Sequence, residues 1–358
     1  MGGLQCLNAD CVILKWSTIA GDTRMTEARM PIKVVQYGLG PIGCAAARAV
    51  LARERLQLVG AVDIDPQKIG RDAGEVLGVG RSLGIEVAAT LQAALQQSPA
   101  DVVLHTTGSF LDAVSGQLTE ILALGLDVVS STEELSYPWA DHDQYAQQID
   151  RAAVQAGRTV LGTGVNPGFL MDTLPLSLTA ICLSARRIAV TRVIDASKRR
   201  GPFQTKIGAG MTVEQFNAEV RGGRMGHIGL RESAAMLCNS FGHSVDHYRE
   251  TIEPVTAAND IERGSAPVRR GDVIGIHQTL SAVCAGTEFV TLTFHAALDA
   301  ENEADRIEID GEPPLQIDLR GTNGDIATVA ILLNAIERVM AAPPGLKTMR
   351  DLPPVYCW

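Results

Sequence analysis

The glycine-rich stretch "GLGPIG" (38–43) constrains the fold more than any other part of this sequence. It follows a short β-rich run, "IKVVQYG" (32–38), and it opens a helix-like segment that is rich in small residues, "PIGCAAARAVLARE" (41–54). A second strand, "LQLVGAVD" (56–63), comes next. Together these segments make a β-α-β unit within about 30 residues, which is the building block of a parallel, doubly wound sheet.

Each glycine of this G-x-G-x-x-G pattern has a physical task. Gly38 allows the tight turn, Gly40 lets the backbone approach a pyrophosphate, and Gly43 permits close packing of helix on strand. The N-terminus of the following helix supplies unpaired N–H groups and a positive dipole. Asp63 lies 20 residues beyond Gly43, where a carboxylate can accept the ribose hydroxyls of a dinucleotide. We therefore predict a bound NAD or NADP, held by Gly38, Leu39, Gly40, Pro41, Ile42, Gly43 and Asp63.

The preference between the two cofactors stays open. Asp63 favours NAD, because its carboxylate would repel a 2′-phosphate. Lys68 and Arg71, in "DIDPQKIGRD", are nevertheless close enough in the sequence to hold that phosphate.

The alternation of strands and helices continues after the second strand. Strands that read as continuous Val, Leu and Ile runs are typical of a sheet covered on both faces. We predict a Rossmann-like dinucleotide-binding domain over residues 31–165, with further strands at 85–90, 100–108, 126–131 and 158–166 and helices at 91–97, 112–124 and 141–156.

The pattern changes beyond residue 166. Apolar residues now alternate at period two, which is typical of antiparallel strands with one exposed face. We predict an α+β second domain over 166–323 with a mostly antiparallel sheet, containing strands at 185–196, 272–286, 288–298, 305–311 and 315–321 and helices near 212–221 and 231–240. A strongly apolar helix, 324–342, follows.

Composition narrows the choice of partner. The net charge is −10, whereas nucleic acids and anionic membranes attract clustered Lys and Arg, so neither is expected as a partner. No stretch approaches the ~20 apolar residues of a membrane span, and we expect a cytoplasmic protein. The seven cysteines are scattered and form no C-x-x-C pair, so we expect no metal site. Residues 1–30 are expected to be a disordered extension or a non-native start.

Two segments at predicted strand ends are candidates for the cofactor cleft. In "LHTTGSF" (104–110), Thr106, Thr107, Gly108 and Ser109 follow the fourth strand, where ligands of open α/β sheets bind. The alternative is a plain turn in which Ser109 caps the next helix. In "GTGVNPGF" (162–169), the Asn166 amide can bond a nicotinamide carboxamide or a substrate, although a hinge explains this segment equally well.

Two further segments are candidates for the substrate pocket. Lys206 lies in the basic, glycine-bearing run "ASKRRGPFQTKIGAGMT" (196–212), and it can receive a polar group of the substrate. The alternative is a solvated charged face. His227 stands between glycines in "RMGHIGLRES" (224–233), unlike a core histidine on an apolar face.

The stretch "VVSSTEELSYPW" (128–139) places Glu133 and Glu134 directly after a strand. Ser131 and Glu134 fit the S-x-x-E spacing of a capping box, which would make Glu134 structural. Glu133 would then be free to point toward a reaction centre at the carboxyl edge of the sheet.

Taken together, several of these motifs resemble one known family: "GLGPIG", "VDIDPQKIG", "SSTEELSYPW", "GTGVNPGF", "KIGAGMT", "GHIGLRES" and "GDIATVAILLNAIERVMAAPPGL". Over residues 31–353 the chain is similar to the 2,4-diaminopentanoate dehydrogenases and native NAD(P)-dependent amine dehydrogenases, a branch of the dihydrodipicolinate-reductase-like fold. The resemblance implies a homodimer with the second sheet at the interface. It also implies that the helix 324–342 and the tail to 358 return to the first domain.

The resemblance further implies reversible oxidative deamination of an amine to a carbonyl compound and ammonia, with a catalytic glutamate in the "TEE" stretch. We assign that role to Glu133, with Glu134 as the alternative. A carboxylate suits this chemistry, because it can shuttle protons and stabilise an iminium. A diamino acid substrate would call for a cation, and Arg192, Arg199 and Lys206 are available. A plain amine would call for an apolar pocket, built from Phe169, Leu170 and Phe203.

Two other functions stay open at this point. One is a dihydrodipicolinate-reductase-type imine reductase, although the region "TRVIDASKRRGPFQTKIGAGMT" lacks the His-His pair and the D-A-P-S-G-T run of those reductases. The other is a non-catalytic dinucleotide-binding sensor, against which the acid pair beside a complete cofactor motif argues.

Overall fold

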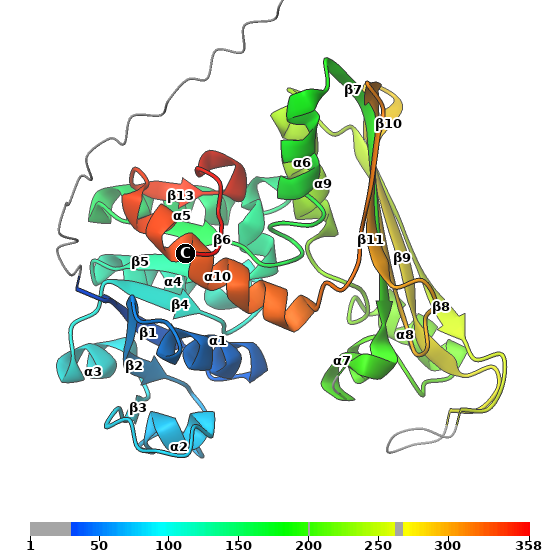
Figure 1. The fold of residues 1–358 in the computed structure, drawn as a ribbon. Helices are drawn as coiled ribbons and strands as arrows, with labels where there is room; N and C mark the ends of the chain where they lie inside the picture. Colours follow the sequence, from blue (N-terminus) through cyan, green and yellow to red (C-terminus); the bar gives the residue numbers. More distant parts are fainter. Residues whose placement is uncertain (1–29, 200, 262–267) are drawn as a thin grey trace, which may run out of the picture.

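The structure, a computed structural model, describes residues 30–199, 201–261 and 268–358. The predicted extension therefore lies outside the described residues, except for Met30. The described chain forms two sheets with helices packed on them (Figure 1). The predicted fold class, a Rossmann-like sheet plus a second, mostly antiparallel sheet, is confirmed.

The first sheet has seven strands, all paired in parallel, in the order β13-β6-β5-β4-β1-β2-β3. Its strands are almost fully buried, which explains their continuous apolar sequences. They are β1 (Ile32–Tyr37), β2 (Leu56–Val62), β3 (Val87–Ala88), β4 (Val102–His105), β5 (Asp127–Ser130), β6 (Thr159–Gly162) and β13 (Gly345–Lys347). The connecting helices are α1 (Pro41–Leu51), α2 (Ala73–Leu77), α3 (Leu91–Gln97), α4 (Leu111–Ala123) and α5 (Asp143–Ala156).

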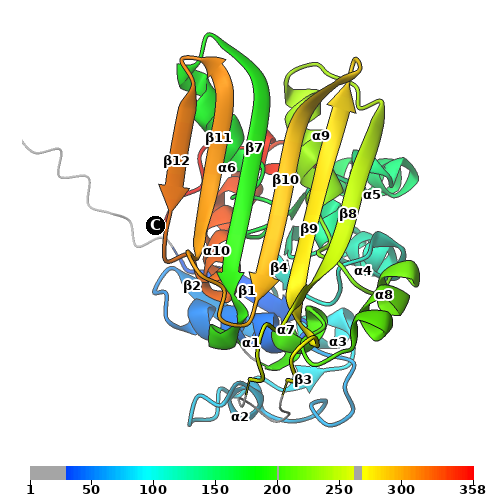
Figure 2. The ribbon, with the colours of Figure 1, turned by 90° about the vertical axis from the view of Figure 1, so that its right-hand side faces the viewer.

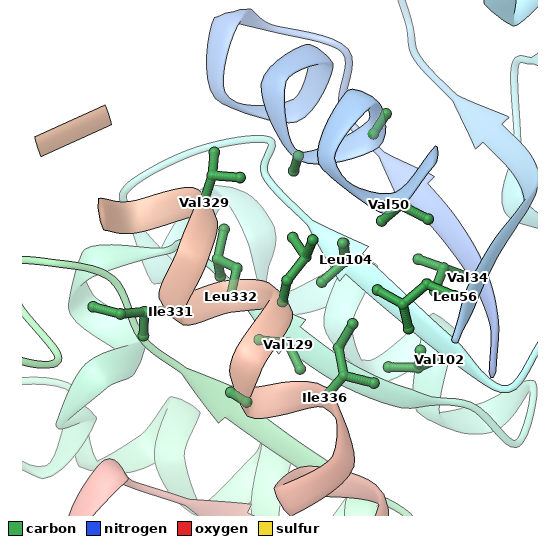
Figure 3. Packing of buried hydrophobic residues seen from close by; sticks show 14 of the residues in the cluster. Val34, Val50, Leu56, Val102, Leu104, Val129, Val329, Ile331, Leu332 and Ile336 are labelled. Atoms are coloured by element: carbon green, nitrogen blue, oxygen red, sulfur yellow. The ribbon is translucent and has the colours of Figure 1, made fainter. Parts of the chain in front are cut away.

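The C-terminal segment packs on this first sheet. Helix α10 (Gly324–Ala341) lies beside α1, and its Leu332 and Ile336 point toward the strand residues Leu104 and Val129 (Figure 3). Strand β13 then pairs with β6 through the register Gly345↔Thr159. The apolar face of α10 thus finds its partner in a sheet that is about two hundred residues away in the chain.

The second sheet has six strands in the order β12-β11-β7-β10-β9-β8. The β7·β10 pair is parallel and the other pairs are antiparallel. The strands are β7 (Ser184–Asp195), β8 (His247–Thr256), β9 (Val273–Cys284), β10 (Thr287–Ala297), β11 (Ala304–Glu312) and β12 (Leu315–Leu319). Strand β8 was not predicted: it contains Pro254 and many charged residues, which an edge strand tolerates.

One face of the second sheet is covered by helices. Figure 1 shows this sheet edge-on, with α6 and α9 on the side of the first sheet, and Figure 2 shows that the opposite face carries no helix among the described residues. The covering helices are α6 (Thr173–Leu178), α7 (Gly201–Lys206), α8 (Val213–Arg221) and α9 (Leu230–Ser240). Five 3₁₀ turns complete the described secondary structure: η1 (Glu133–Ser136), η2 (Pro138–Ala140), η3 (Thr179–Ile181), η4 (Ala196–Lys198) and η5 (Met349–Asp351).

None of the described helices has the length and apolar character that a bilayer crossing requires.

Candidate active site

The glycine turn joins β1 to α1 as the sequence predicted. A Cβ on Gly43 would lie 1.9 Å from the Gly38 carbonyl oxygen, and a Cβ on Gly38 would lie 2.7 Å from the Thr106 carbonyl oxygen. Both positions therefore exclude a side chain. At Gly40, by contrast, an added Cβ would meet no described atom within 4 Å. Helix α1 starts at Pro41 without a side-chain cap among the described residues, so its first N–H groups are available to a phosphate.

Asp63 directly follows β2 and is held in place by the glycine turn itself. Its Oδ2 accepts a hydrogen bond from the Leu39 N–H at 2.7 Å, and its Oδ1 accepts one from the Asp65 N–H at 2.8 Å. Burial alone would raise the pKa of Asp63. The two N–H donors and Lys68, whose Nζ lies 3.1 Å from Oδ2, nevertheless bring this pKa below its usual value. Arg71 is directed elsewhere, to Glu75 at 2.7 Å.

A cavity of about 430 Å³ opens at the carboxyl ends of β4, β5 and β6. Ligands of open α/β sheets bind at this edge. The first sheet and its loops contribute Gly40, Pro41, Ile42, Thr106, Thr107, Gly108, Ser109, Ser131, Glu133, Val165 and Asn166 to the lining.

The two adjacent glutamates after β5 are directed to different places. Glu133 lines the cavity. Glu134 is turned toward α4: its Oε2 accepts a hydrogen bond from the Leu111 N–H at 2.6 Å, and its Oε1 lies 3.2 Å from His142 Nε2. The capping-box interpretation of Ser131 and Glu134 is thus wrong: the N-cap residue of η1 is Thr132, without a side-chain cap, and Glu134 instead accepts from the first N–H of α4, which needs an acceptor from outside the helix.

The same contact corrects the alternative given for Ser109. Helix α4 has Phe110 at its N-cap position with no cap from that side chain, and the acceptor comes from Glu134 instead. Ser109 lines the cavity, and its carbonyl oxygen accepts a hydrogen bond from the Glu134 N–H at 3.3 Å.

The opposite wall of the cavity comes from the second sheet and its helices. It combines apolar side chains with three cations, and its residues are Arg192, Ile194, Arg199, Phe203, Lys206, Ile207, Gly226, His227, Ile276 and Phe294. Lys206 and His227, both predicted as pocket residues, line this cavity. Phe169 does not: it packs against the core of the first sheet, beside the buried Leu170.

The three cations are held differently. Arg192 is 2% exposed, and its Nε lies 3.4 Å from Asp305 Oδ1, while its Nη1 is buried and has no partner among the described residues. Arg199 pairs with Asp325 at 2.6 Å, and its guanidinium lies 4.7 Å from the ring centre of Phe203. No ion pair of Lys206 is found among the described residues. A buried guanidinium donor without a partner is costly, so Arg192 is suited to an anionic ligand.

His227 and Asn166 meet across the cavity wall. Asn166 Nδ2 and His227 Nε2 are 2.7 Å apart, and the imidazole is stacked on Phe294 with ring centres 4.3 Å apart. Burial, followed by the nearby charges of Lys206 and Arg192, lowers the pKa of His227 to about 3. The imidazole is therefore neutral at neutral pH.

The start of α10 also belongs to the site, although it was not among the predicted site residues. Gly324, Asp325 and Thr328 line the cavity, because α10 crosses from the second sheet to the first at this point. Asn323 caps α10 by accepting hydrogen bonds from the N–H groups of Asp325 and Ile326. An asparagine at this position is a common N-cap, so the sequence could have indicated where this helix starts. Arg192, which the sequence offered as a cation for the substrate, shares the inward face of β7 with Val190 and Ile194.

No group of three or more potential metal ligands occurs in the described part of the chain.

Comparison with known proteins supports one family. The family model for the 2,4-diaminopentanoate dehydrogenase C-terminal domain matches residues 169–358, and the model for the N-terminus of dihydrodipicolinate reductase matches residues 32–141. The chain is 30% identical to 2,4-diaminopentanoate dehydrogenase from Acetoanaerobium sticklandii, over 90% of this chain and 93% of that protein. It is 26% identical to an amine dehydrogenase from Streptomyces virginiae, over 90% and 96%.

A solved structure agrees with these sequence matches. The amine dehydrogenase from Mycobacterium smegmatis superposes with a TM-score of 0.81 at 25% identity, over 92% of this chain and 98% of that one.

Proposed function

Because the chain belongs to the 2,4-diaminopentanoate dehydrogenase family, we propose that its cavity carries out the reversible oxidative deamination of a primary amine. The protein is an NAD(P)-dependent oxidoreductase that acts on CH–NH2 donors. In balanced form, the substrate ammonium ion, NAD(P)⁺ and water give the carbonyl compound, an ammonium ion, NAD(P)H and one proton. The observation that carries the proposal is a carboxylate, Glu133, at the carboxyl edge of the sheet in a cavity that also contains the glycine turn.

The residues present fit a dinucleotide. Gly40 leaves open space where a pyrophosphate must approach, α1 offers free N–H groups, and Asp63 is ionised at the end of β2. When bound, the nicotinamide would accept a hydride from the amine-bearing carbon or return it in the reverse direction. Thr106, Thr107, Gly108 and Ser109 line the cavity between this turn and Glu133, and we propose them as contacts for the nicotinamide end.

We propose Glu133 as the general acid and base. In the oxidative direction its carboxylate takes a proton from the substrate ammonium, which frees the nitrogen lone pair to support departure of the hydride. Its negative charge then stabilises the iminium, and the same group serves the addition of water. Glu134 is engaged with Leu111 and His142, which favours Glu133 of the two.

The charge of the opposite wall supports a substrate with a carboxylate. In a chain with a net charge of −10, three cations gather at this one cavity: Arg192, Arg199 and Lys206. Phe203 also lines it, but Phe169, on which a closed apolar pocket would depend, is directed into the core. An amino acid that also carries the reacting amine, of the kind named for the Acetoanaerobium relative, fits this arrangement better than a plain amine does.

The reductase alternative is less well supported. The family model for the N-terminus of dihydrodipicolinate reductase matches residues 32–141, and curated reductases of this type align over only 43–44% of this chain, whereas residues 169–358 match the diaminopentanoate dehydrogenase model. The cavity residues that come from the second sheet lie in that C-terminal part.

We further propose that residues 31–165, together with the segment from 324 to 358, form the dinucleotide-binding domain of a cytoplasmic homodimer, and that 166–323 form the substrate and dimerisation domain. One face of the second sheet carries no helix among the described residues, which supports a dimer (Figure 2). Its central strands present half-buried threonines there, including the cross-strand pair Thr279 and Thr293. Light scattering coupled to gel filtration tests this state, and a charge placed at Thr279 should dissociate the dimer.

The function is tested by mixing the protein with ammonium, NADH or NADPH, and a panel of carbonyl compounds. A matched pair, 4-oxopentanoate and 2-pentanone, differs only in the terminal carboxylate. We expect consumption of reduced cofactor, with kcat/KM higher for 4-oxopentanoate. Turnover of dihydrodipicolinate without turnover of any carbonyl would contradict the proposal, and a preference for 2-pentanone would reject the carboxylate-bearing substrate alone.

A further inference from the structure

The contact between His227 and Asn166 is held rigidly from the second sheet. The His227 N–H donates to Gln278 Oε1 at 2.6 Å, and Gln278 Nε2 donates back to the His227 carbonyl oxygen at 3.2 Å. The imidazole also stacks on Phe294 at an interplanar angle of 10°. Backbone and ring are thus both fixed, so the position of Nε2, 2.7 Å from Asn166 Nδ2, is fixed too.

The Asn166 amide lies with Nδ2 toward His227 Nε2, at 2.7 Å. Burial and two nearby cations keep the imidazole neutral, and in this arrangement the ring carries its own proton on Nδ1, so that Nε2 accepts from Asn166. The other end of the amide, Oδ1, is buried and has no hydrogen-bond partner among the described residues. A buried acceptor left unpaired destabilises the free protein, and a ligand N–H removes that cost.

We propose that His227 is a positioning residue, which orients the Asn166 amide so that Oδ1 accepts a hydrogen bond from the reacting nitrogen of the substrate. This inference rests on the proposed deaminase function. Asn166 and Glu133 follow the neighbouring strands β6 and β5 and line the same cavity, so both are available to a ligand bound there. The two contacts differ in chemistry, because an amide oxygen only accepts whereas a carboxylate also takes the proton.

Two substitutions of His227 separate positioning from other roles. His227→Phe keeps an aromatic ring to stack on Phe294 but removes the acceptor for Asn166 Nδ2. His227→Gln places an amide oxygen close to the position of Nε2 and so restores an acceptor that cannot transfer protons. We expect kcat/KM for the amine to fall by about tenfold to about a hundredfold in His227→Phe, which is the range for a lost hydrogen bond to a charged group. His227→Gln should recover most of that loss.

A double-substitution cycle tests whether His227 affects turnover through Asn166. Asn166→Ala should lose about as much as His227→Phe, and the double variant should lose no more than Asn166→Ala alone, because both changes remove the same contact. NADH affinity, measured by fluorescence titration, and the thermal unfolding midpoint are determined for every variant. Both should stay close to the wild-type values.

Each result that differs from these expectations leads to a different conclusion. Additive losses in the cycle, or wild-type kcat/KM in His227→Phe, would overturn the inference. An equal loss in His227→Gln and His227→Phe would make His227 a proton-transfer group instead. A loss of NADH affinity that matches the loss of kcat/KM would assign Asn166 to the cofactor carboxamide. Absence of amine turnover in the wild-type protein would contradict the proposed function itself, which keeps the two failures distinguishable.

Discussion

Glu134 Oε2 accepts a hydrogen bond from the backbone N–H of Leu111, with 2.6 Å between oxygen and nitrogen. This contact ties the turn after β5 to the first residue of α4, the helix that follows β4. It satisfies a helix N-terminus with a carboxylate, which the helix dipole also favours. The neighbouring Glu133 lines the cavity, so the two adjacent acids are directed to different places.

Glu133→Gln should lower kcat for the amine by about a hundredfold or more, because an amide cannot exchange the proton. Cofactor affinity, measured by fluorescence titration, should survive. Glu134→Gln is the matched control: its amide oxygen still accepts from the Leu111 N–H, so turnover should persist. The reverse pattern in the two variants would transfer the catalytic role to Glu134.

Gly43→Ala should abolish cofactor binding and lower the unfolding midpoint. The new Cβ would lie 1.9 Å from the Gly38 carbonyl oxygen and 2.6 Å from Thr106 Oγ1, so the helix would have to move away from the strand. Gly40→Ala provides the comparison, since its Cβ meets no described atom within 4 Å. That variant should keep its stability and lose only cofactor affinity, measured by calorimetric titration. Equal stability losses in both variants would contradict this interpretation of the turn.

Lys68→Ala should weaken binding of NADP more than binding of NAD. Lys68 Nζ lies 3.1 Å from Asp63 Oδ2, so it is the cation nearest to the carboxylate that would otherwise repel a 2′-phosphate. Arg71→Ala is the control, because Arg71 is paired with Glu75 on the surface. The ratio of the two KM values, for NADP and for NAD, is the measurement. A larger change of this ratio in Arg71→Ala would show that Arg71 leaves Glu75 to hold the phosphate.

Glu232→Gln should stabilise the protein at pH 8 and change little at pH 4. Burial, reinforced by the charges of Glu134 and Asp141, raises the pKa of Glu232 to about 7 from its usual value of 4.5. Between these two values the folded state keeps a proton that the unfolded state has lost, so Glu232 makes stability fall as pH rises through this window.

The difference in unfolding free energy between wild type and Glu232→Gln, measured by denaturant unfolding across pH 4–8, isolates the contribution of this carboxyl group from that of the buried histidines. His105 and His227, with pKa values lowered by burial to about 4 and about 3, have the opposite dependence: they make stability rise with pH up to about their unfolded value near 6.5. We expect a gain of order 1 kcal/mol or more at pH 8. A difference in unfolding free energy that does not change with pH would contradict the raised pKa of Glu232.

The parts of the site that were predictable are those set by neighbours in the sequence. The turn Gly38–Gly43, the acid Asp63 at the end of β2, and Lys206 and His227 at the cavity were all found from patterns of a few residues. The choice of Glu133 over Glu134 was made on a capping-box argument that the structure corrects. The cap belongs to α4, whose sequence position gives no hint of a partner 23 residues later.

The sequence by itself determined the local structure: buried strands from apolar runs, the glycine turn from its G-x-G-x-x-G spacing, and one sheet with two different faces from alternation. These depend on backbone sterics and on the period of side chains along an element, which short stretches encode. Only the tertiary structure decided that Arg192, the start of α10 and the Asn166–His227 contact meet Glu133 in one cavity. Such contacts join segments far apart in the chain, and they form because each apolar face is buried against whichever distant element covers it.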